Sequence, residues 1–198
     1  LAAHPPSQYA RLSIWPDGGV SRLRLMGTVS RGGRDRWGIT RLDALAPDEA
    51  RAELLACCAS TAWANRMCDA RPFGDLAKAK AEALRAAEGL GEGDWLEAFA
   101  AHPRIGERKA DARGWSTQEQ SGVGHAAQAT LDALAEANRA YEAKHGFVYL
   151  VCATGKSADE MLALARHRLG MDRAHELAQA SEEQRKITEL RLEKLVVR

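Results

Sequence analysis

The stretch that decides the fold class is Asp75-Leu-Ala-Lys-Ala-Lys-Ala-Glu-Ala-Leu-Arg-Ala-Ala87. Its alanines and leucines follow the roughly 3.6-residue period of an α-helix. The pattern begins at Asp75, and Gly89 follows where helices commonly end. The sequence therefore predicts a helix here. The same alanine-, leucine- and charge-rich pattern continues on both sides, so the chain after residue 42 is predicted to be all-α.

Capping residues and glycines divide this part into about seven helices. Pro47 suits a first helical turn, Ser60 and Asp94 can act as N-caps, and Ser157-Ala-Asp-Glu160 has the pattern of a capping box. The predicted helices cover residues 47 to about 59, 60–71, 75–87, 94–102, 116–141, 157–170 and 172 to about 196. Only the apolar run 147–152 is predicted to be extended.

The first part of the chain has a different pattern. Apolar and polar residues alternate over 9–15 and 20–25 around the turn Pro16-Asp-Gly-Gly19, which predicts one β-hairpin. The glycine- and arginine-rich residues that follow are typical of a flexible linker. The predicted division is a hairpin appendage at 1–29, a linker at 30–42 and a single helical domain at 43–198.

Composition excludes several classes of partner. The chain has 28 Lys and Arg against 27 Asp and Glu, a net charge of +1, so no net field attracts nucleic acid. No apolar run approaches the roughly 20 residues of a membrane-spanning helix, and no signal-peptide pattern is visible. The four cysteines form no CxxC pair and are predicted to be free thiols. We expect a protein of the bacterial cytoplasm that binds neither nucleic acid nor membrane.

Most sequence signatures of catalysis are absent. The six histidines include no HExxH pair, and there is no GxSxG motif of a serine hydrolase. Gly155-Lys156-Ser157 is similar to the end of a phosphate-binding loop, but the upstream glycine is missing, which favours a turn and a helix cap. No metal site is predicted.

Three local features could serve chemistry, and each also has a purely structural explanation. His102 precedes Pro103, which biases its backbone to an extended form and stiffens the loop, yet a histidine at a helix C-terminus is common. Ser116 and Glu119 form a capping box or else a polar helix end that faces an anionic ligand. Arg168, on an apolar helical stripe, either extends its guanidinium to water or reaches a buried carboxylate.

Seven short motifs, in this order and spacing, resemble the OHCU decarboxylase family, which acts on 2-oxo-4-hydroxy-4-carboxy-5-ureidoimidazoline (OHCU). They are Cys57-Cys-Ala-Ser-Thr-Ala-Trp63, Arg71-Pro-Phe73, Ala101-His-Pro103, Ser116-x-x-Glu-Gln120, Asn138-x-x-Tyr-x-x-Lys-x-Gly-Phe147, Arg168-Leu169 and Ile187-x-x-x-Arg-Leu192. The chain departs from the family at Arg104-Ile105, where Asp-Leu is frequent, and at Met171, where Asn is frequent. Residues 4–28 instead resemble the C-terminal end of allantoicase, and that tail alone implies no allantoicase activity.

The resemblance implies a homodimer that converts OHCU to (S)-allantoin in urate breakdown. By the same resemblance His102 and Glu119 are catalytic, with His102 as the acid or base. Further substrate contacts are implied for Pro103, Ser116, Thr117, Gln118, Gln120 and Arg168, and for backbone groups of Tyr149, Leu150, Val151, Cys152 and Ala153. The substrate ring can take up the electrons left by CO₂, so no cofactor is expected.

Two other functions remain open. The chain could be a non-catalytic helical assembly module beside an allantoicase remnant, or a histidine-dependent hydrolase of a related ureido compound such as 5-hydroxyisourate. Assays on freshly formed OHCU and on 5-hydroxyisourate distinguish the three.

Overall fold

The computed structural model describes residues 28–105 and 128–197, and every regular element in these two ranges is an α-helix. The helices are α1 (Arg31–Ala44), α2 (Pro47–Leu55), α3 (Thr61–Asp69), α4 (Leu76–Glu88), α5 (Glu92–Ala100), α7 (Gln128–His145), α8 (Ala158–Leu169) and α9 (Arg173–Val196). The predicted all-α class is confirmed for the described residues. The predicted hairpin strands, 9–15 and 20–25, lie outside the described residues.

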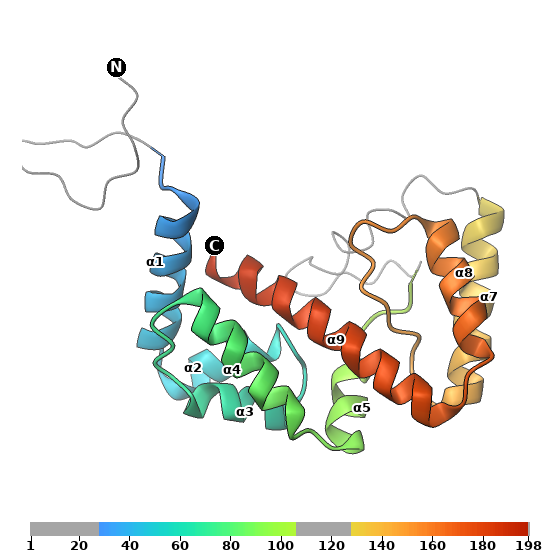
Figure 1. The fold of residues 1–198 in the computed structure, drawn as a ribbon, viewed down its shortest axis with the longest axis horizontal. Coiled ribbons are helices and arrows are strands. Elements are labelled where there is room, and N and C mark those ends of the chain that lie inside the picture. The colour runs from blue at the N-terminus through green and yellow to red at the C-terminus, as the bar shows by residue number, and fades with distance from the viewer. Residues whose placement is uncertain (1–27, 106–127, 198) are drawn as a thin grey trace, which may run out of the picture.

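Helix α9 runs through the middle of the molecule and organises the packing (Figure 1). It contacts α1 and α4 on one side, and α5 and α7 farther along. Helices α7 and α8 pack against each other at the opposite end from α1 (Figure 1). Ala180, Ile187, Leu192 and Leu195 of α9 are all buried in the core. The central helix therefore joins the two ends of the molecule through one apolar core.

Most helices begin where the sequence predicts. The predicted N-caps Ser60 and Ser157 each accept a hydrogen bond from the backbone N–H three residues later. Asp75 and Asp172, where two other predicted helices begin, do the same. The prediction for Asp94 is wrong, because Gly91 is the N-cap of α5 and Asp94 accepts from its N–H at 2.9 Å. The carboxylate satisfies a free N–H from inside the first turn, so the helix starts earlier. Helix α2 also ends earlier than predicted, at Leu55.

The predicted linker is also wrong, because most of it forms α1 and raises the number of described helices to eight. Ser30 caps this helix by accepting a hydrogen bond from the Gly33 N–H at 3.1 Å. Ile39 and Leu42, three residues apart on one helical face, are fully buried. The glycine content indicated flexibility, but Gly38 allows close packing instead, since a Cβ there would lie 1.8 Å from the Val196 carbonyl oxygen.

This close approach gives a testable prediction for the fold. The variant Gly38→Ala is expected to lower the free energy of unfolding by about 1–3 kcal/mol, the usual cost of overpacking. Gly32→Ala on the same helix is the control, because an added Cβ there meets nothing within 4 Å. Urea denaturation of both variants measures the difference, and equal stability of the two would contradict a tight contact between α1 and α9.

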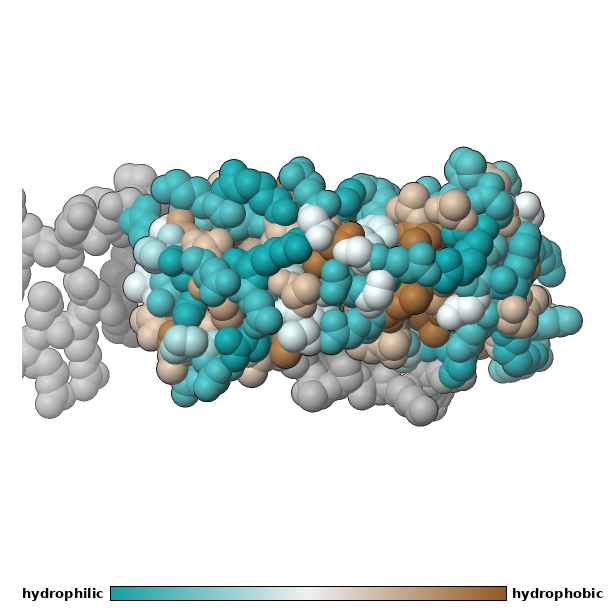
Figure 2. All heavy atoms as spheres, turned by 90° about the horizontal axis from the view of Figure 1, so that it is seen from below, coloured by the Kyte–Doolittle hydropathy of each residue, from teal (hydrophilic) through white to brown (hydrophobic). Residues whose placement is uncertain are grey.

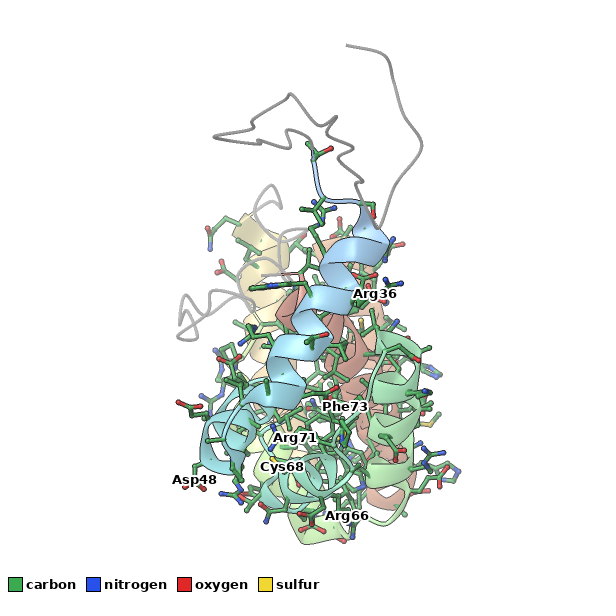
Figure 3. The ribbon with its side chains drawn as sticks, turned by 90° about the vertical axis from the view of Figure 1, so that its left-hand side faces the viewer. Arg36, Asp48, Arg66, Cys68, Arg71 and Phe73 are labelled. Atoms are coloured by element: carbon green, nitrogen blue, oxygen red, sulfur yellow. The ribbon has the colours of Figure 1, made fainter. Side chains whose placement is uncertain are left out.

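Arg71 fixes α3 against the end of α1. Its guanidinium donates to the carbonyl oxygens of Leu42 at 2.8 Å and Leu45 at 2.9 Å. The Phe73 N–H donates to Asp43 Oδ1 at 2.9 Å, and Figure 3 shows Arg71 and Phe73 near the lower end of α1. The motif that begins at Arg71 therefore has a structural role in this chain.

The surface gives little indication of a large apolar interface on the face that Figure 2 shows. Hydrophilic residues cover most of that face, and the hydrophobic residues gather in small groups between them (Figure 2). Among the helices that the structure describes, none is long and apolar enough to cross a membrane. The four cysteines are free thiols, as predicted.

Candidate active site

Two segments that are distant in the sequence line one pocket. His102, Pro103 and Ile105 come from the loop after α5, and residues 149–154 come from the connection between α7 and α8. Ile187 and Leu190 of α9 complete the described lining. The pocket is partly open to solvent, and its cavity volume between the described residues is about 30 Å³. The structure thus brings together His102, Pro103 and all five residues that the sequence analysis singled out at 149–153.

The loop that carries His102 is held at both ends. The His102 N–H donates to the carbonyl oxygen of Phe99, near the C-terminus of α5, at 3.0 Å. Beyond it, Arg104 donates to the two carboxylate oxygens of Glu142 at 2.8 and 3.0 Å. The buried Asn138 donates to the Ile105 carbonyl oxygen at 3.1 Å. Arg104, which departs from the family pattern, therefore links the histidine loop to α7.

The backbone of the 149–153 segment is held by charged side chains. Arg168 Nη1 donates to the Leu150 carbonyl oxygen at 2.7 Å. Glu183 Oε2 accepts the Cys152 N–H at 2.7 Å, and Lys156 Nζ donates to the Cys152 carbonyl oxygen at 2.7 Å. Three backbone groups of this segment are therefore bonded to charged side chains, and a fourth, the Ala153 carbonyl oxygen, accepts the Lys156 N–H at 3.0 Å.

Arg168 points into the protein and is only 6% exposed. Its Nε donates to Glu176 Oε2 at 2.8 Å, and its Nη2 donates to the Tyr141 hydroxyl at 3.3 Å. Of the two local alternatives, the guanidinium has reached a buried carboxylate rather than water. Arg168 is not among the described lining residues of the pocket. Its contact with a substrate carboxylate stays a prediction.

Burial and hydrogen bonding change the pKa values of three side chains in and around the 149–153 segment. Burial raises the pKa of Tyr149 to about 12, so its phenol is neutral at ordinary pH. Burial, followed by the hydrogen bond to Glu176, raises the pKa of Tyr141. Burial alone would raise the pKa of Glu183, but hydrogen bonds from Lys186 and from the Cys152 N–H outweigh it and lower that pKa. Glu183 is therefore an anion in the folded protein at neutral pH.

The lowered pKa of Glu183 predicts how stability depends on pH. Since the folded pKa lies below the ordinary value of 4.5, the carboxylate adds stability that is fully present above pH 4.5. This contribution is lost as the pH falls through the folded pKa. Unfolding midpoints of the wild type and of Glu183→Gln, measured on both sides of pH 4.5, should therefore converge as the pH falls. A difference between the two unfolding midpoints that does not change with pH would show that ionised Glu183 adds no such stability.

Five predicted site residues lie outside the described residues, between 106 and 127. They are Ser116, Thr117, Gln118, Glu119 and Gln120. Their placement relative to His102 stays a prediction, as does the start of the helix predicted at 116.

Two buried charged residues of α9, on turns next to the pocket residue Ile187, were not predicted as site residues. Glu183 is 6% exposed and holds the 149–153 segment. Arg191 is 7% exposed and lies one helical turn after Ile187, which lines the pocket. The available signal was spacing, because Glu183 and Arg191 each lie four residues from Ile187 on the same helix. In the described part of the chain, no group of three or more His, Cys, Asp or Glu side chains could hold a metal ion.

The described residues define an all-helical protein with a pocket beside a loop histidine. The chain belongs to the OHCU decarboxylase family, whose family model matches residues 43–193.

Individual relatives agree with this assignment. The chain is 34% identical over 154 residues to the uric acid degradation bifunctional protein TTL of Arabidopsis thaliana. That match covers 72% of this chain and 46% of the plant protein, so the chain spans about half of this relative's length. It is also similar to a crystal structure of OHCU decarboxylase in the presence of (S)-allantoin, with 35% identity and a TM-score of 0.67, covering 74% of this chain and 98% of that one.

A more distant structural relative shares the fold alone. It is a crystal structure of (S)-allantoin synthase with 17% identity and a TM-score of 0.61, and the match covers 79% of this chain and 53% of that one.

Proposed function

We propose that this chain catalyses the decarboxylation of OHCU to (S)-allantoin. The observation that carries the proposal is that His102 and the 149–153 segment line the same pocket. Membership of the OHCU decarboxylase family supports it, as does the likeness to an OHCU decarboxylase solved in the presence of (S)-allantoin.

The reaction needs binding, orientation and proton transfer. When the carbon–carbon bond to the carboxylate breaks, CO₂ leaves, and its bonding electrons form a double bond to the neighbouring ring carbon while the imine nitrogen of the ring takes up a proton. The product is an enol whose hydroxyl is on the carbon that lost CO₂. The neighbouring carbon, which carries the ureido arm, then gains a proton, and the hydroxyl gives up its proton to become the carbonyl of allantoin. His102, on the face that loses the carboxylate, delivers the proton to the carbon that carries the ureido arm as a general acid. Delivery from a single face gives a single enantiomer.

The remaining roles in this proposal concern orientation. Glu119 accepts hydrogen bonds from N–H groups of the ring or of the ureido arm, and Ser116 and Gln120 bond the substrate beside it. If Arg168 meets the substrate carboxylate, it does so with N–H groups of its guanidinium other than the three that bond Glu176, Leu150 and Tyr141. Arg191 supplies a second buried cation on the turn of α9 that follows Ile187.

The test is a direct assay on unstable substrates. Urate oxidation generates 5-hydroxyisourate and then OHCU in the cuvette, and circular dichroism follows the appearance of optically active allantoin. Formation of (S)-allantoin well above the spontaneous rate is the expected result. Acceleration of 5-hydroxyisourate decay alone would instead indicate the hydrolase, and acceleration of neither step would indicate the assembly module.

We also propose that the chain forms a homodimer and works in the cytoplasm of a bacterium. The support for both is the family resemblance together with the composition of the chain. Sedimentation equilibrium tests the first, and fractionation of the source cells tests the second.

A further inference from the structure

We propose that Glu183 and Arg168 are positioning residues for the 149–153 segment. They bond the backbone of Cys152 and Leu150, the residues on either side of Val151, so that the Val151 backbone faces the substrate. This inference rests on the proposed function, because it assigns which backbone groups of the segment bind OHCU.

The hydrogen bonds of the segment follow a pattern. The groups bonded by Arg168, Glu183 and Lys156 belong to Leu150 and Cys152, which are alternate residues. In an extended chain the N–H and C=O of one residue point to one side, and those of the next residue point to the other side. The sequence predicts that residues 147–152 are extended, so we infer that the backbone groups of Tyr149, Val151 and Ala153 face away from these three side chains.

These hydrogen bonds leave only some backbone N–H and C=O groups of the segment for a ligand. The Cys152 N–H is taken by Glu183, and the Leu150 carbonyl is taken by Arg168. The Ala153 carbonyl accepts the Lys156 N–H at 3.0 Å in the turn that follows. The N–H and C=O of Val151 and the N–H of Ala153 are left on the opposite edge, in a segment that lines the pocket with His102. A donor and acceptor pair of this kind matches the alternating C=O and N–H groups of a ureido compound.

Several hydrogen bonds fix the Glu183 carboxylate, which accepts the Cys152 N–H. Its side chain is buried, and it accepts from Lys186 at 2.7 Å and from Gln179 at 3.2 Å in addition to the Cys152 N–H. A hydrogen bond to a carboxylate is shorter and roughly twice as strong as one between neutral groups. The amide of Cys152 is therefore fixed to α9.

Arg168 acts on the same segment from a second helix. Its guanidinium is itself fixed by Glu176 of α9 and Tyr141 of α7, whose hydroxyl donates to Glu176 Oε2 at 2.6 Å. Its carbon Cζ lies 5.0 Å from the centre of the Tyr149 ring. An anion on α9 and a cation on α8 thus hold one N–H and one C=O of the segment, two residues apart.

The experiment compares Glu183→Ala with Glu182→Ala. Glu182 is the matched control, because it is the preceding residue of α9 and its side chain is 51% exposed. Glu183→Ala leaves the Cys152 N–H without its acceptor, and the resulting shift of the segment is expected to lower kcat/KM for OHCU by about 10²-fold. Glu182→Ala should match the wild type. Glu183→Gln keeps an acceptor oxygen but loses the charge, so its kcat/KM should lie between that of Glu183→Ala and that of the wild type, about one order of magnitude below the wild type.

Two readouts separate positioning from simple loss of structure. Amide hydrogen exchange at Cys152 should be faster in Glu183→Ala, while exchange in the core helices stays slow. Wild-type kcat/KM in a folded Glu183→Ala protein would overturn the inference. If Glu183→Ala does not fold, Glu183→Gln decides, since a lower kcat/KM with faster amide exchange at Cys152 and unchanged slow exchange in the core helices supports the inference, and an unchanged kcat/KM overturns it. Failure of the proposed function looks different, because the wild type itself would not accelerate OHCU decarboxylation.

Discussion

Replacing His102 by asparagine is expected to lower kcat/KM for OHCU decarboxylation by about 10²–10⁴-fold, the usual contribution of a positioned general acid. Asparagine keeps a polar side chain but cannot deliver a proton. The hydrogen bond from the backbone of residue 102 to Phe99 does not depend on the side chain, so the fold should persist. Stopped-flow circular dichroism on freshly formed OHCU measures both the rate and the handedness of the product.

The matched control for this variant is His175→Asn. His175 lies near the start of α9 with a side chain that is 76% exposed, and it pairs with Asp172 away from the described lining of the pocket. This control should keep wild-type kcat/KM. Undiminished, stereospecific turnover by His102→Asn would show that another group donates the proton.

The variant Arg168→Met is expected to lower the free energy of unfolding by about 3–5 kcal/mol, because it leaves a buried charge without its partner. The Glu176 side chain is 1% exposed, so water cannot replace the guanidinium. The Leu150 carbonyl and the Tyr141 hydroxyl lose a donor in the same step. Urea denaturation, followed by far-ultraviolet circular dichroism, gives the difference in stability.

A surface ion pair provides the comparison. Arg85 pairs with Glu82 on α4 with a side chain that is 63% exposed, and Arg85→Met should leave the unfolding midpoint close to that of the wild type. The double variant Arg168→Met with Glu176→Leu removes both buried charges and should regain part of the lost stability. If Arg168→Met were no more destabilising than Arg85→Met, the buried pair would have no special weight in the fold.

The parts of the fold that were predictable from sequence depend on local interactions. Ser157 accepts from the N–H of Glu160, three residues away, so the cap and the pattern that reveals it lie in the same few residues. Helix α1 was missed for the opposite reason. Gly38 looks like a flexible position until Val196, at the other end of the described chain, is placed against it.

The same distinction applies to the site. The family motifs indicated His102 and the 149–153 segment, and the two meet in one pocket. The apolar stripe around Arg168 is compatible with a guanidinium that points to water or into the protein. It points inward because Glu176, on the next helix, accepts its hydrogen bond. Glu183 resembles any charged residue of a long helix in sequence. Its partner, the N–H of Cys152, lies 31 residues away and becomes visible only in three dimensions.

The contact between α1 and α9 has a practical consequence for anyone who prepares shorter forms of this protein. The family match begins at residue 43, close to the end of α1, so a fragment cut at that boundary would lose nearly the whole helix. Leu195 and Val196, now buried, would lose part of their cover, and a newly exposed apolar patch favours aggregation. The smallest fragment that should stay monodisperse and resist proteolysis therefore begins at Ser30, where the helix cap is retained.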